Sequence, residues 1–415
     1  MNKRIAIIAC AIGLPGEKGY SRFPYLANML CGQGYDVDLY TSTFNHWEKA
    51  QRKNDKVRSI QEKVPYNIVL AYEPGYKKNI DIRRVRSHGK LAGNLLLKID
   101  ENHTGNPYDL LYVIIPDNKL AADVSQFGKK NKIPVIVDIE DLWPEGMELI
   151  LSVPKFIGNI VFASLRKNAK RAYHNADAYV GTSDEFRDEP LKYGEGKGKE
   201  RITVYVGCDL EIFDRGVERY SNDIDKGEDE FWVIYSGTLG ASYDIGTLVR
   251  AAQVIKEQGY DHIKFKILGG GPLKEQFENI AEKKPCKVEF LGYVPYEKMA
   301  AYLSKSDVTI NSFVKSAPQS IVNKIGDYLA AGKPMINTLS SPEFRRKVED
   351  DEFGMNVEAE DENALARAIL VLYNDLPKRE KFCINSRKTA ANQFDRITSY
   401  QEITKLIGKV IQSKG

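Results

Sequence analysis

The chain has 415 residues, of which 42% are hydrophobic and 28% are charged. This length is enough for two domains of ordinary size, and the composition is typical of a globular protein in water. The formal net charge of +3 is too small to indicate a nucleic-acid partner, and the five scattered cysteines argue against a disulfide framework or a zinc site. We expect no secretory signal, because glycines and charges follow the apolar run at residues 5–14 at once, and no membrane span, because no uncharged apolar stretch reaches about 18 residues.

Short apolar runs alternate with helical patterns along the first half of the chain. The helical patterns include residues 24–33 and 165–174, and glycine and proline punctuate the runs between them. This alternation predicts right-handed strand–helix–strand units around a parallel sheet. The expected strands are residues 5–11, 37–41, 68–71, 110–115, 135–139, 178–181 and 202–206.

Two turns that follow early strands carry candidate site residues. Residues 13–19 have the pattern G-x-x-G-x-x-G with Gly16 at its centre, and Arg22 follows shortly after. The dinucleotide-binding pattern is G-x-G-x-x-G, so a dehydrogenase is a distant interpretation. His46 lies in the sequence Phe-Asn-His-Trp after the second strand. It is either a general base, a contact to a ligand, or a merely structural residue.

The sequence Asp-Leu-Trp-Pro-Glu follows the fifth expected strand. Asp141, Trp143 and Glu145 would then lie at the carboxyl end of a parallel strand, where open sheets bind their ligands. The alternative is a turn with a buried tryptophan and two solvated acids. Residues 149–171 come next and combine many apolar side chains with lysine and arginine but no acid. Such a stretch is either a surface that touches an anionic membrane or a buried helix with a basic solvent face.

A second alternating half follows residues 215–230, which are charged, have no apolar face and indicate a linker or a surface loop. Glycine-bearing turns close two of its strands, one with Gly237, Thr238 and Gly240 and the other with Gly270. Glycine lets the backbone approach a ligand closely, and the following helix can aim its amino end at a phosphate. The expected strands are residues 231–235, 264–268, 288–290, 308–311 and 334–337.

Residues 319–337 are the most informative stretch of the chain. They predict a short helix with Ser320 as its N-cap and Gly332 at its end, followed by a buried strand. Asn323, Lys324 and Asp327 are one to four residues apart, so their side chains can converge on one ligand. An acid for ribose hydroxyls, a lysine and a helix amino end form a cradle suited to a nucleoside diphosphate. The alternative is an amphipathic helix with a solvated polar face.

These motifs, in their order and spacing, resemble the retaining glycosyltransferases of the GT-B fold. That family usually shows Glu, seven residues, Glu and then Ala-Met-Ala-x-Gly-x-Pro, and Gln319 and Asp327 stand at the two Glu positions here. The segment with Tyr293 and Val294 is similar to the family loop that packs against the nucleotide base, and residues 204–209 resemble the segment before the interdomain linker. The Asp-Leu-Trp-Pro-Glu sequence looks like the subgroup that builds bacterial capsule and O-antigen polysaccharides.

The resemblance implies an α/β protein of two Rossmann-like, doubly wound parallel-sheet domains that face each other across a cleft. Residues 1–214 would bind the acceptor, with helix 397–412 crossing back to them, and residues 215–396 would bind the nucleotide sugar. The implied reaction moves a sugar from a uridine-linked nucleoside diphosphate to a lipid-linked saccharide. It proceeds with retention, without metal or cofactor, by a front-face displacement in which the leaving phosphate helps to take the acceptor proton. The location would be the cytoplasm, either free or peripheral on the inner face of the membrane.

The resemblance also assigns roles to individual residues. Asp327 would hold the ribose, Lys324 the diphosphate and Gln319 the hydroxyls of the transferred sugar. Asp141 and His46 would serve the acceptor side, and these two with Gln319 are the catalytic candidates. The expected donor contacts are Gly237, Thr238, Gly240, Gly270, Tyr293, Val294, Ser320, Asn323, Lys324 and Asp327, and the expected acceptor contacts are Gly16, Arg22, His46, Trp143 and Glu145.

Two other functions stay open at this point. The first is a uridine-diphosphate-sugar 2-epimerase of the same two-domain shape, although the paired acids and histidine usual in that family are not evident. The second is a non-catalytic subunit that supports a partner. It is motivated by Gln319 and by Thr238 and Asp244, which stand where the family often has an Arg and Lys pair for the diphosphate.

Overall fold

The protein is described by a computed structural model. It describes residues 2–17, 19, 21–78, 81–151, 154–283, 286, 288–317 and 320–413. The chain divides into two compact units, and the last stretch of sequence groups with the first of them. Unit 1 comprises Met1–Val204 with Tyr400–Gly415, and unit 2 comprises Tyr205–Ser399. This division lies about ten residues before the predicted one at 214.

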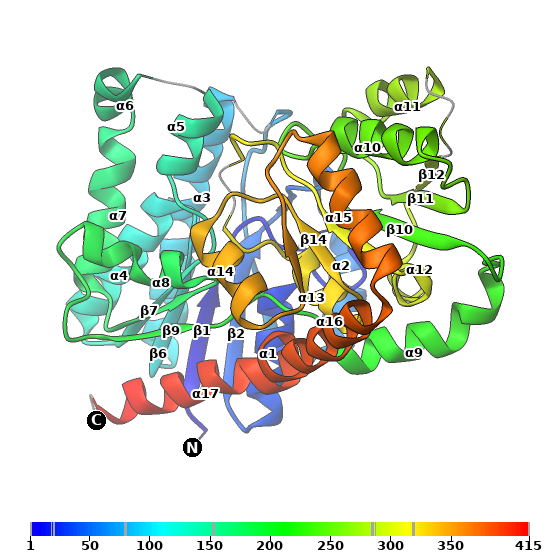
Figure 1. Cartoon of the computed structure of the whole chain (residues 1–415). Helices are drawn as coiled ribbons and strands as arrows, with labels where there is room; N and C mark the ends of the chain where they lie inside the picture. The colour runs from blue at the N-terminus through cyan, green and yellow to red at the C-terminus, as the bar shows by residue number, and fades with distance from the viewer. Residues whose placement is uncertain are drawn as a thin grey trace. The chain divides into compact units, whose positions relative to one another are not determined.

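Unit 1 is built on a seven-stranded parallel sheet with helices on both of its faces (Figure 1). The strands, in spatial order, are β5 (Asn67–Ala71), β2 (Asp36–Ser42), β1 (Arg4–Ile8), β6 (Leu110–Ile115), β7 (Val135–Ile139), β8 (Ala178–Gly181) and β9 (Glu200–Thr203). A short antiparallel pair, β3 (Phe44–Asn45) and β4 (Ala50–Gln51), follows β2. The helices are α1 (Arg22–Gly32), α2 (Asn54–Gln61), α3 (Ile82–Gly105), α4 (Asn118–Asn131), α5 (Glu145–Leu151), α6 (Lys155–Val161), α7 (Ala163–Asn175), α8 (Asp184–Lys192) and, from Tyr400 onward, α17 (Arg396–Gln412).

Unit 2 repeats this plan with a six-stranded parallel sheet. Its strands, in spatial order, are β12 (Val288–Gly292), β11 (Ile263–Leu268), β10 (Phe231–Ser236), β13 (Val308–Asn311), β14 (Met335–Asn337) and β15 (Gly354–Asn356). Its helices are α9 (Leu210–Tyr220), α10 (Ile245–Glu257), α11 (Lys274–Glu282), α12 (Tyr296–Lys305), α13 (Lys324–Ala330), α14 (Pro342–Asp350), α15 (Glu362–Asn374) and α16 (Leu376–Thr389), with a 3-10 turn Ser221–Asp223 and a π-helical turn Ala390–Phe394.

Both sheets are buried on both faces, which explains why their strands are continuous apolar runs. In β1, Ile5 and Ile7 pack into one core of unit 1, whereas Ala6 and Ile8 pack into the core on the opposite face. The chain order reverses between β1 and β6 in unit 1, and between β10 and β13 in unit 2. Open α/β sheets bind ligands beyond the carboxyl ends of their strands at such reversals. The two reversals therefore mark where a site is to be sought in each unit.

Two sequence predictions about local structure need correction. Residues 215–230 are a loop only in their second part, because α9 extends through Tyr220, and the segment is not without an apolar face, because Ile224 is buried and Val217 packs against the same core. Gly216 of α9 lies so close to α12 that a β-carbon there would be 2.7 Å from the Glu297 Cα atom. The helix predicted from Ser320 begins only at Lys324, and Ser320 does not cap it. Strand β15 was not predicted, because its three residues are too few to show an apolar strand pattern.

None of the helices in the described part of the chain combines the length and the apolar composition that a bilayer crossing requires.

Candidate functional site

Two glycine loops meet at the reversal of unit 2. The loop after β10 donates from Leu239 N–H to the Gly270 carbonyl of the loop after β11, at 2.9 Å. Gly269 has a φ of +128°, and a β-carbon there would lie 1.9 Å from the Gly237 carbonyl oxygen. Only glycine fits such a backbone contact. The predicted donor residues Gly237, Thr238, Gly240 and Gly270 are thus brought together, with Thr238 and Gly270 on the exposed side.

Helix α13 is fixed against the end of β10 by one buried side chain. The Tyr328 hydroxyl accepts from Ser236 N–H at 2.7 Å and donates to the Ser236 carbonyl at 3.0 Å. Both groups of a strand end are thereby satisfied by one residue of the helix. This contact places the side chains of α13 beside the glycine loops. Ser320 precedes the helix, and its buried hydroxyl oxygen has no hydrogen-bond partner in the described part of the chain.

Lys324 opens α13 and has an unusual environment. Its ammonium nitrogen is buried and has no hydrogen-bond partner within the described ranges. The nitrogen lies 4.1 Å from the ring centre of Tyr235, 4.5 Å from that of Tyr243 and 5.0 Å from that of Phe313. Its Cδ atom lies 3.6 Å from the position of a β-carbon at Gly237, so the side chain runs beneath the first glycine loop. Burial lowers the pKa of Lys324 well below its usual range.

Asp327 lies one turn further along α13 and faces different neighbours. Its carboxylate accepts a hydrogen bond from the Tyr296 hydroxyl at 2.8 Å. Burial raises the pKa of this carboxyl from 3.8 to about 6, although the Tyr296 hydrogen bond and the charge of Arg396 oppose the shift. Lys324 and Asp327 therefore do not share a contact, but both belong to the helix that borders the glycine loops.

The other predicted donor residues differ in how far they are exposed to solvent. Asn323 is exposed just before α13. Tyr293 is 75% exposed in the turn after β12, while Val294 beside it packs against the core of unit 2. Gln319 lies outside the described residues.

At the reversal of unit 1, polar side chains from five segments form a cluster at the carboxyl ends of the strands. His46 Nδ1 lies 2.5 Å from the Tyr76 hydroxyl, and the ring of His88 lies edge-on to that of Tyr76. His88 Nδ1 lies 3.0 Å from the Asp117 carboxylate. Trp143 stacks in parallel on His88 with its ring centre 6.2 Å away. The structure thus joins two predicted residues, His46 and Trp143, in one cluster.

Three members of this cluster were missed by the sequence analysis, namely Tyr76, His88 and Asp117. One signal was available for Asp117, because it follows the buried strand β6 almost directly, as Asp141 follows β7. Asp117 also caps α4 by accepting from the backbone N–H groups of Lys119 and Leu120. Burial alone would raise the pKa of Asp117, but hydrogen bonds from His88 and from this helix end outweigh it and hold the pKa below its usual range. His88 lies within the long helix α3 and Tyr76 in the loop after β5, and no sequence motif marks either of them.

The remaining acceptor-side candidates are held by their neighbours. Asp141 is exposed and accepts from the Trp143 indole N–H at 3.1 Å. Partial desolvation raises the pKa of its carboxyl, while the hydrogen bonds from Trp143 and Leu142 lower it, and the net shift is upward. Glu145 accepts from the Tyr193 hydroxyl at 3.0 Å. Gly16 is exposed with a φ of +78° and open space around it.

Arg22 is not an acceptor contact. Its side chain has no exposed surface, and its guanidinium pairs with Asp138 at 3.2 Å and with Glu140 at 3.0 Å. It also donates to the Val204 carbonyl at 2.9 Å. A guanidinium held by two acids inside the core is a structural element of unit 1, because either acid would otherwise be buried without a counter-charge.

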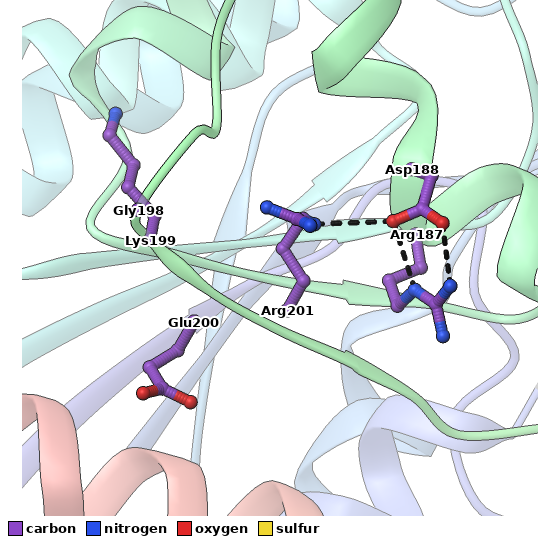
Figure 2. Close-up of a pocket in the computed structure, with 6 residues that line it drawn as sticks. All are labelled: Arg187, Asp188, Gly198, Lys199, Glu200 and Arg201. Atoms are coloured by element: carbon purple, nitrogen blue, oxygen red, sulfur yellow. Dashed lines mark hydrogen bonds and ion pairs between the residues drawn. The ribbon is translucent and has the colours of Figure 1, made fainter.

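One open hollow on unit 1 contains none of these residues. It has a volume of about 460 Å³ and is lined by side chains at the start of β9 and on α8. Figure 2 shows Arg187 and Arg201 turned toward the same acid, Asp188, so both guanidinium groups already have a counter-charge. It lies at the amino end of its strand rather than at the carboxyl end, and we do not assign a ligand to it. Within the described ranges, no group of acids, histidines or cysteines is arranged to hold a metal ion.

Comparisons with known proteins agree with this architecture. Residues 230–375 match the family of glycosyl transferases group 1. Sucrose-phosphate synthase from Thermosynechococcus elongatus superposes with a TM-score of 0.73 at 19% identity, over 99% of this chain and 100% of that chain. HepE from Anabaena, solved in complex with UDP, superposes with a TM-score of 0.69 at 14% identity, over 98% and 100% of the two chains. At these identities the likeness establishes the fold.

Two curated proteins are similar in sequence. One, from Campylobacter jejuni, is named a GalNAc-alpha-(1->4)-GalNAc-alpha-(1->3)-diNAcBac-PP-undecaprenol alpha-1,4-N-acetyl-D-galactosaminyltransferase, and is 26% identical over 183 residues, 44% of this chain and 49% of that protein. The other is the putative glycosyltransferase EpsD of Bacillus subtilis, 24% identical over 163 residues, 39% and 42% of the two chains. The match thus spans about half the length of these relatives or less. The chain has the GT-B fold of glycosyltransferases, and its residues 230–375 match the group 1 glycosyltransferase family.

Proposed function

We propose that this protein is a retaining, metal-independent glycosyltransferase of bacterial surface polysaccharide synthesis. It transfers a sugar from a uridine-diphosphate sugar, bound by unit 2, to a lipid-linked saccharide, bound by unit 1. Asp327 binds the ribose hydroxyls and Lys324 the diphosphate. The group 1 match over unit 2, the UDP complex of HepE and the name of the Campylobacter relative, which acts on an undecaprenol-diphosphate saccharide, support this proposal.

The observation that carries the proposal is the unpartnered ammonium of Lys324. A buried amine without an acceptor is costly, so its position requires a reason. The side chain runs under the glycine loop whose backbone can approach a phosphate closely, and a lysine stem is flexible enough to follow a ligand. A diphosphate leaving group needs positive charge nearby, and neither Thr238 nor Asp244 supplies it. Lys324 places an amine beside these loops.

A screen of nucleotides tests the proposed donor. We expect UDP and a UDP-sugar, without added metal, to raise the thermal midpoint of the protein, and the UDP-sugar to be hydrolysed slowly to UDP. GDP- and dTDP-sugars serve as controls for the base. Release of UDP with formation of a free 2-epimer would favour the epimerase, whereas no midpoint shift with any nucleotide would favour a non-catalytic subunit.

We also propose that α6 touches the membrane that carries the acceptor lipid. Phe156, Ile160 and Val161 are 70%, 78% and 62% exposed on this helix, and the exposed Lys167 and Lys170 follow on α7. An exposed apolar face beside basic residues fits the surface of an anionic bilayer. This complementarity of charge favours a lipid surface over an apolar protein partner.

Vesicle flotation tests this contact. We expect the protein to float with vesicles of anionic phospholipid and less with zwitterionic ones. The double substitution Phe156→Ser with Ile160→Ser should lower the bound fraction by at least about tenfold, because each side chain contributes about 1.5–3 kcal/mol when buried. The matched control is Ile384→Ser on α16, which removes an apolar side chain of similar exposure, 68%, from unit 2. Equal binding by the α6 variant and the control would contradict the proposal.

A further inference from the structure

The imidazole of His46 has two neighbours at the same ring nitrogen. The Tyr76 hydroxyl lies 2.5 Å from Nδ1, and the Lys49 ammonium nitrogen lies 3.4 Å from it. An ammonium can only donate hydrogen bonds, so it faces an unprotonated nitrogen. If Nδ1 accepts, the Tyr76 hydroxyl donates to it as well, and the ring hydrogen of a neutral His46 lies on Nε2.

The neighbours of Tyr76 agree with this direction of donation. His88 Nδ1 faces the Asp117 carboxylate, which accepts, so the ring hydrogen of His88 lies on Nδ1. His88 Nε2 is then an acceptor, and Arg84 Nε–H points to it at 3.5 Å. The Tyr76 oxygen is 3.4 Å from His88 Nε2 but 2.5 Å from His46 Nδ1, and the shorter contact receives the hydroxyl hydrogen. In this arrangement His88 donates to Asp117, and Tyr76 donates to His46 rather than to His88.

His46 also stays neutral at physiological pH. Burial, together with the charges of Lys49 and Arg84, lowers its pKa to about 3. An imidazole with so low a pKa is a poor proton acceptor near pH 7, which disfavours His46 as a general base. It nevertheless has one strong donor left, the Nε2–H group, for which no partner is found among the described residues.

We propose that His46 donates its Nε2 hydrogen to an oxygen of the bound saccharide, and that Tyr76 is the positioning residue that holds His46 in this tautomer. Trp47 packs edge-on against the His46 ring and is 51% exposed, so an aromatic side chain that can contact the apolar side of a sugar lies next to the imidazole. The chemistry requires a ligand oxygen that accepts, such as a hydroxyl or a ring oxygen. The assignment of the saccharide rests on the proposed function, whereas the tautomer does not.

Nitrogen NMR of the whole protein tests the tautomer directly. The chain has five histidines, so long-range proton–nitrogen spectra of histidine-labelled protein are tractable, and His46 is identified by its loss in His46→Gln. We expect a protonated Nε2 and an unprotonated Nδ1 for His46, unchanged between about pH 5 and 8.5. A protonated Nδ1, or a titration near pH 6.5, would overturn the inference. In Tyr76→Phe the Nδ1 shift should move toward that of a mixture of tautomers.

Paired substitutions test the donor role. Glutamine places its amide NH₂ near the position of Nε2, whereas asparagine places it near Nδ1. With the UDP-sugar from the screen and a polyprenyl-diphosphate-linked saccharide as acceptor, His46→Gln should keep at least about tenfold more activity than His46→Asn, through a lower acceptor KM. Equal activities would contradict the donor role. UDP binding is measured separately in both variants, so failure of the proposed function appears as absent UDP binding in the wild type, while the spectra still decide the tautomer.

Discussion

Replacing Lys324 by methionine is expected to weaken the binding of UDP by about 30- to 1,000-fold while unit 2 stays folded. Methionine has nearly the same length and keeps the contacts with Tyr235, Tyr243 and Phe313, which line the ammonium. It removes only the positive charge. The expected loss corresponds to about 2–4 kcal/mol, the size of charge-assisted hydrogen bonds to a phosphate. Titration calorimetry measures it.

The same substitution should raise the stability of the unliganded protein. The pKa of Lys324 is lowered in the folded state, so the unfolded state binds the proton more tightly, and the cost of burying the amine is present below its unfolded pKa. Wild-type stability therefore gains from this group as the pH rises, and Lys324→Met lacks that gain.

Binding of UDP by the wild type should also take up protons if the buried amine is neutral before binding. Calorimetry in buffers of different ionisation enthalpy detects this proton uptake.

Lys333→Met is the matched control for both effects. Burial also lowers the pKa of Lys333, but this lysine lies at the other end of α13, near Cys383 and Asp307 rather than the glycine loops. It should change stability without changing UDP affinity. If both variants bind UDP as the wild type does, Lys324 is a structural lysine enclosed by aromatic rings, and the diphosphate assignment fails.

Replacing Asp327 by asparagine is expected to weaken UDP-sugar binding by about 10- to 100-fold at pH 7.5, because a neutral amide accepts weaker hydrogen bonds from ribose hydroxyls than a carboxylate does. The variant should at the same time be more stable at that pH by about 1–2 kcal/mol. The two-unit rise of the pKa to about 6 sets an upper limit of about 3 kcal/mol, which partial exposure of the side chain reduces. Opposite changes in affinity and stability identify a residue placed for binding.

The pH dependence of Asp327 has a defined sign. The folded pKa is about 6 against 3.8 for an ordinary aspartate, so the folded state holds the proton more tightly. This group therefore lowers stability as the pH rises from about 4 to about 6, and Asp327→Asn should lose that slope. UDP-sugar affinity should fall as the pH drops below about 6 in the wild type but not in the variant. The UDP-sugar is the proper probe, since the terminal phosphate of UDP itself titrates near pH 6.

Tyr296→Phe provides a second check on the same carboxyl. The Tyr296 hydroxyl donates to Asp327 at 2.8 Å and lowers its pKa. Without this hydrogen bond the transition in UDP-sugar affinity should move to higher pH. An unchanged transition in Tyr296→Phe, or a transition that persists in Asp327→Asn, would show that another group titrates.

The fold was predictable because its signal is local and repeated. Strands such as β6 and β7 are buried on both faces, so each one reads as an unbroken apolar run that needs no knowledge of its partners. The prediction of two doubly wound parallel sheets is confirmed. The helix α9 was missed, because its apolar residue Phe213 precedes the charged segment that was read as a linker. The start of α13 was placed three residues too early, because Ser320 has the residue type of an N-cap but not its hydrogen bond.

The candidate site was also predictable only where its signal is local. The sequence alone indicated Lys324 and Asp327, whose spacing sets them on one short helix, and the two glycine loops, which each follow an apolar strand. Only the tertiary structure decided what these side chains face, because the rings around Lys324 come from three other segments of the chain and Tyr296 reaches Asp327 from the start of α12. The same holds in unit 1, where Tyr76, His88 and Asp117 set the hydrogen bonding of His46 from up to 71 positions away. Burial and hydrogen-bond partners determine a pKa or a tautomer, and both arise only when distant segments pack together.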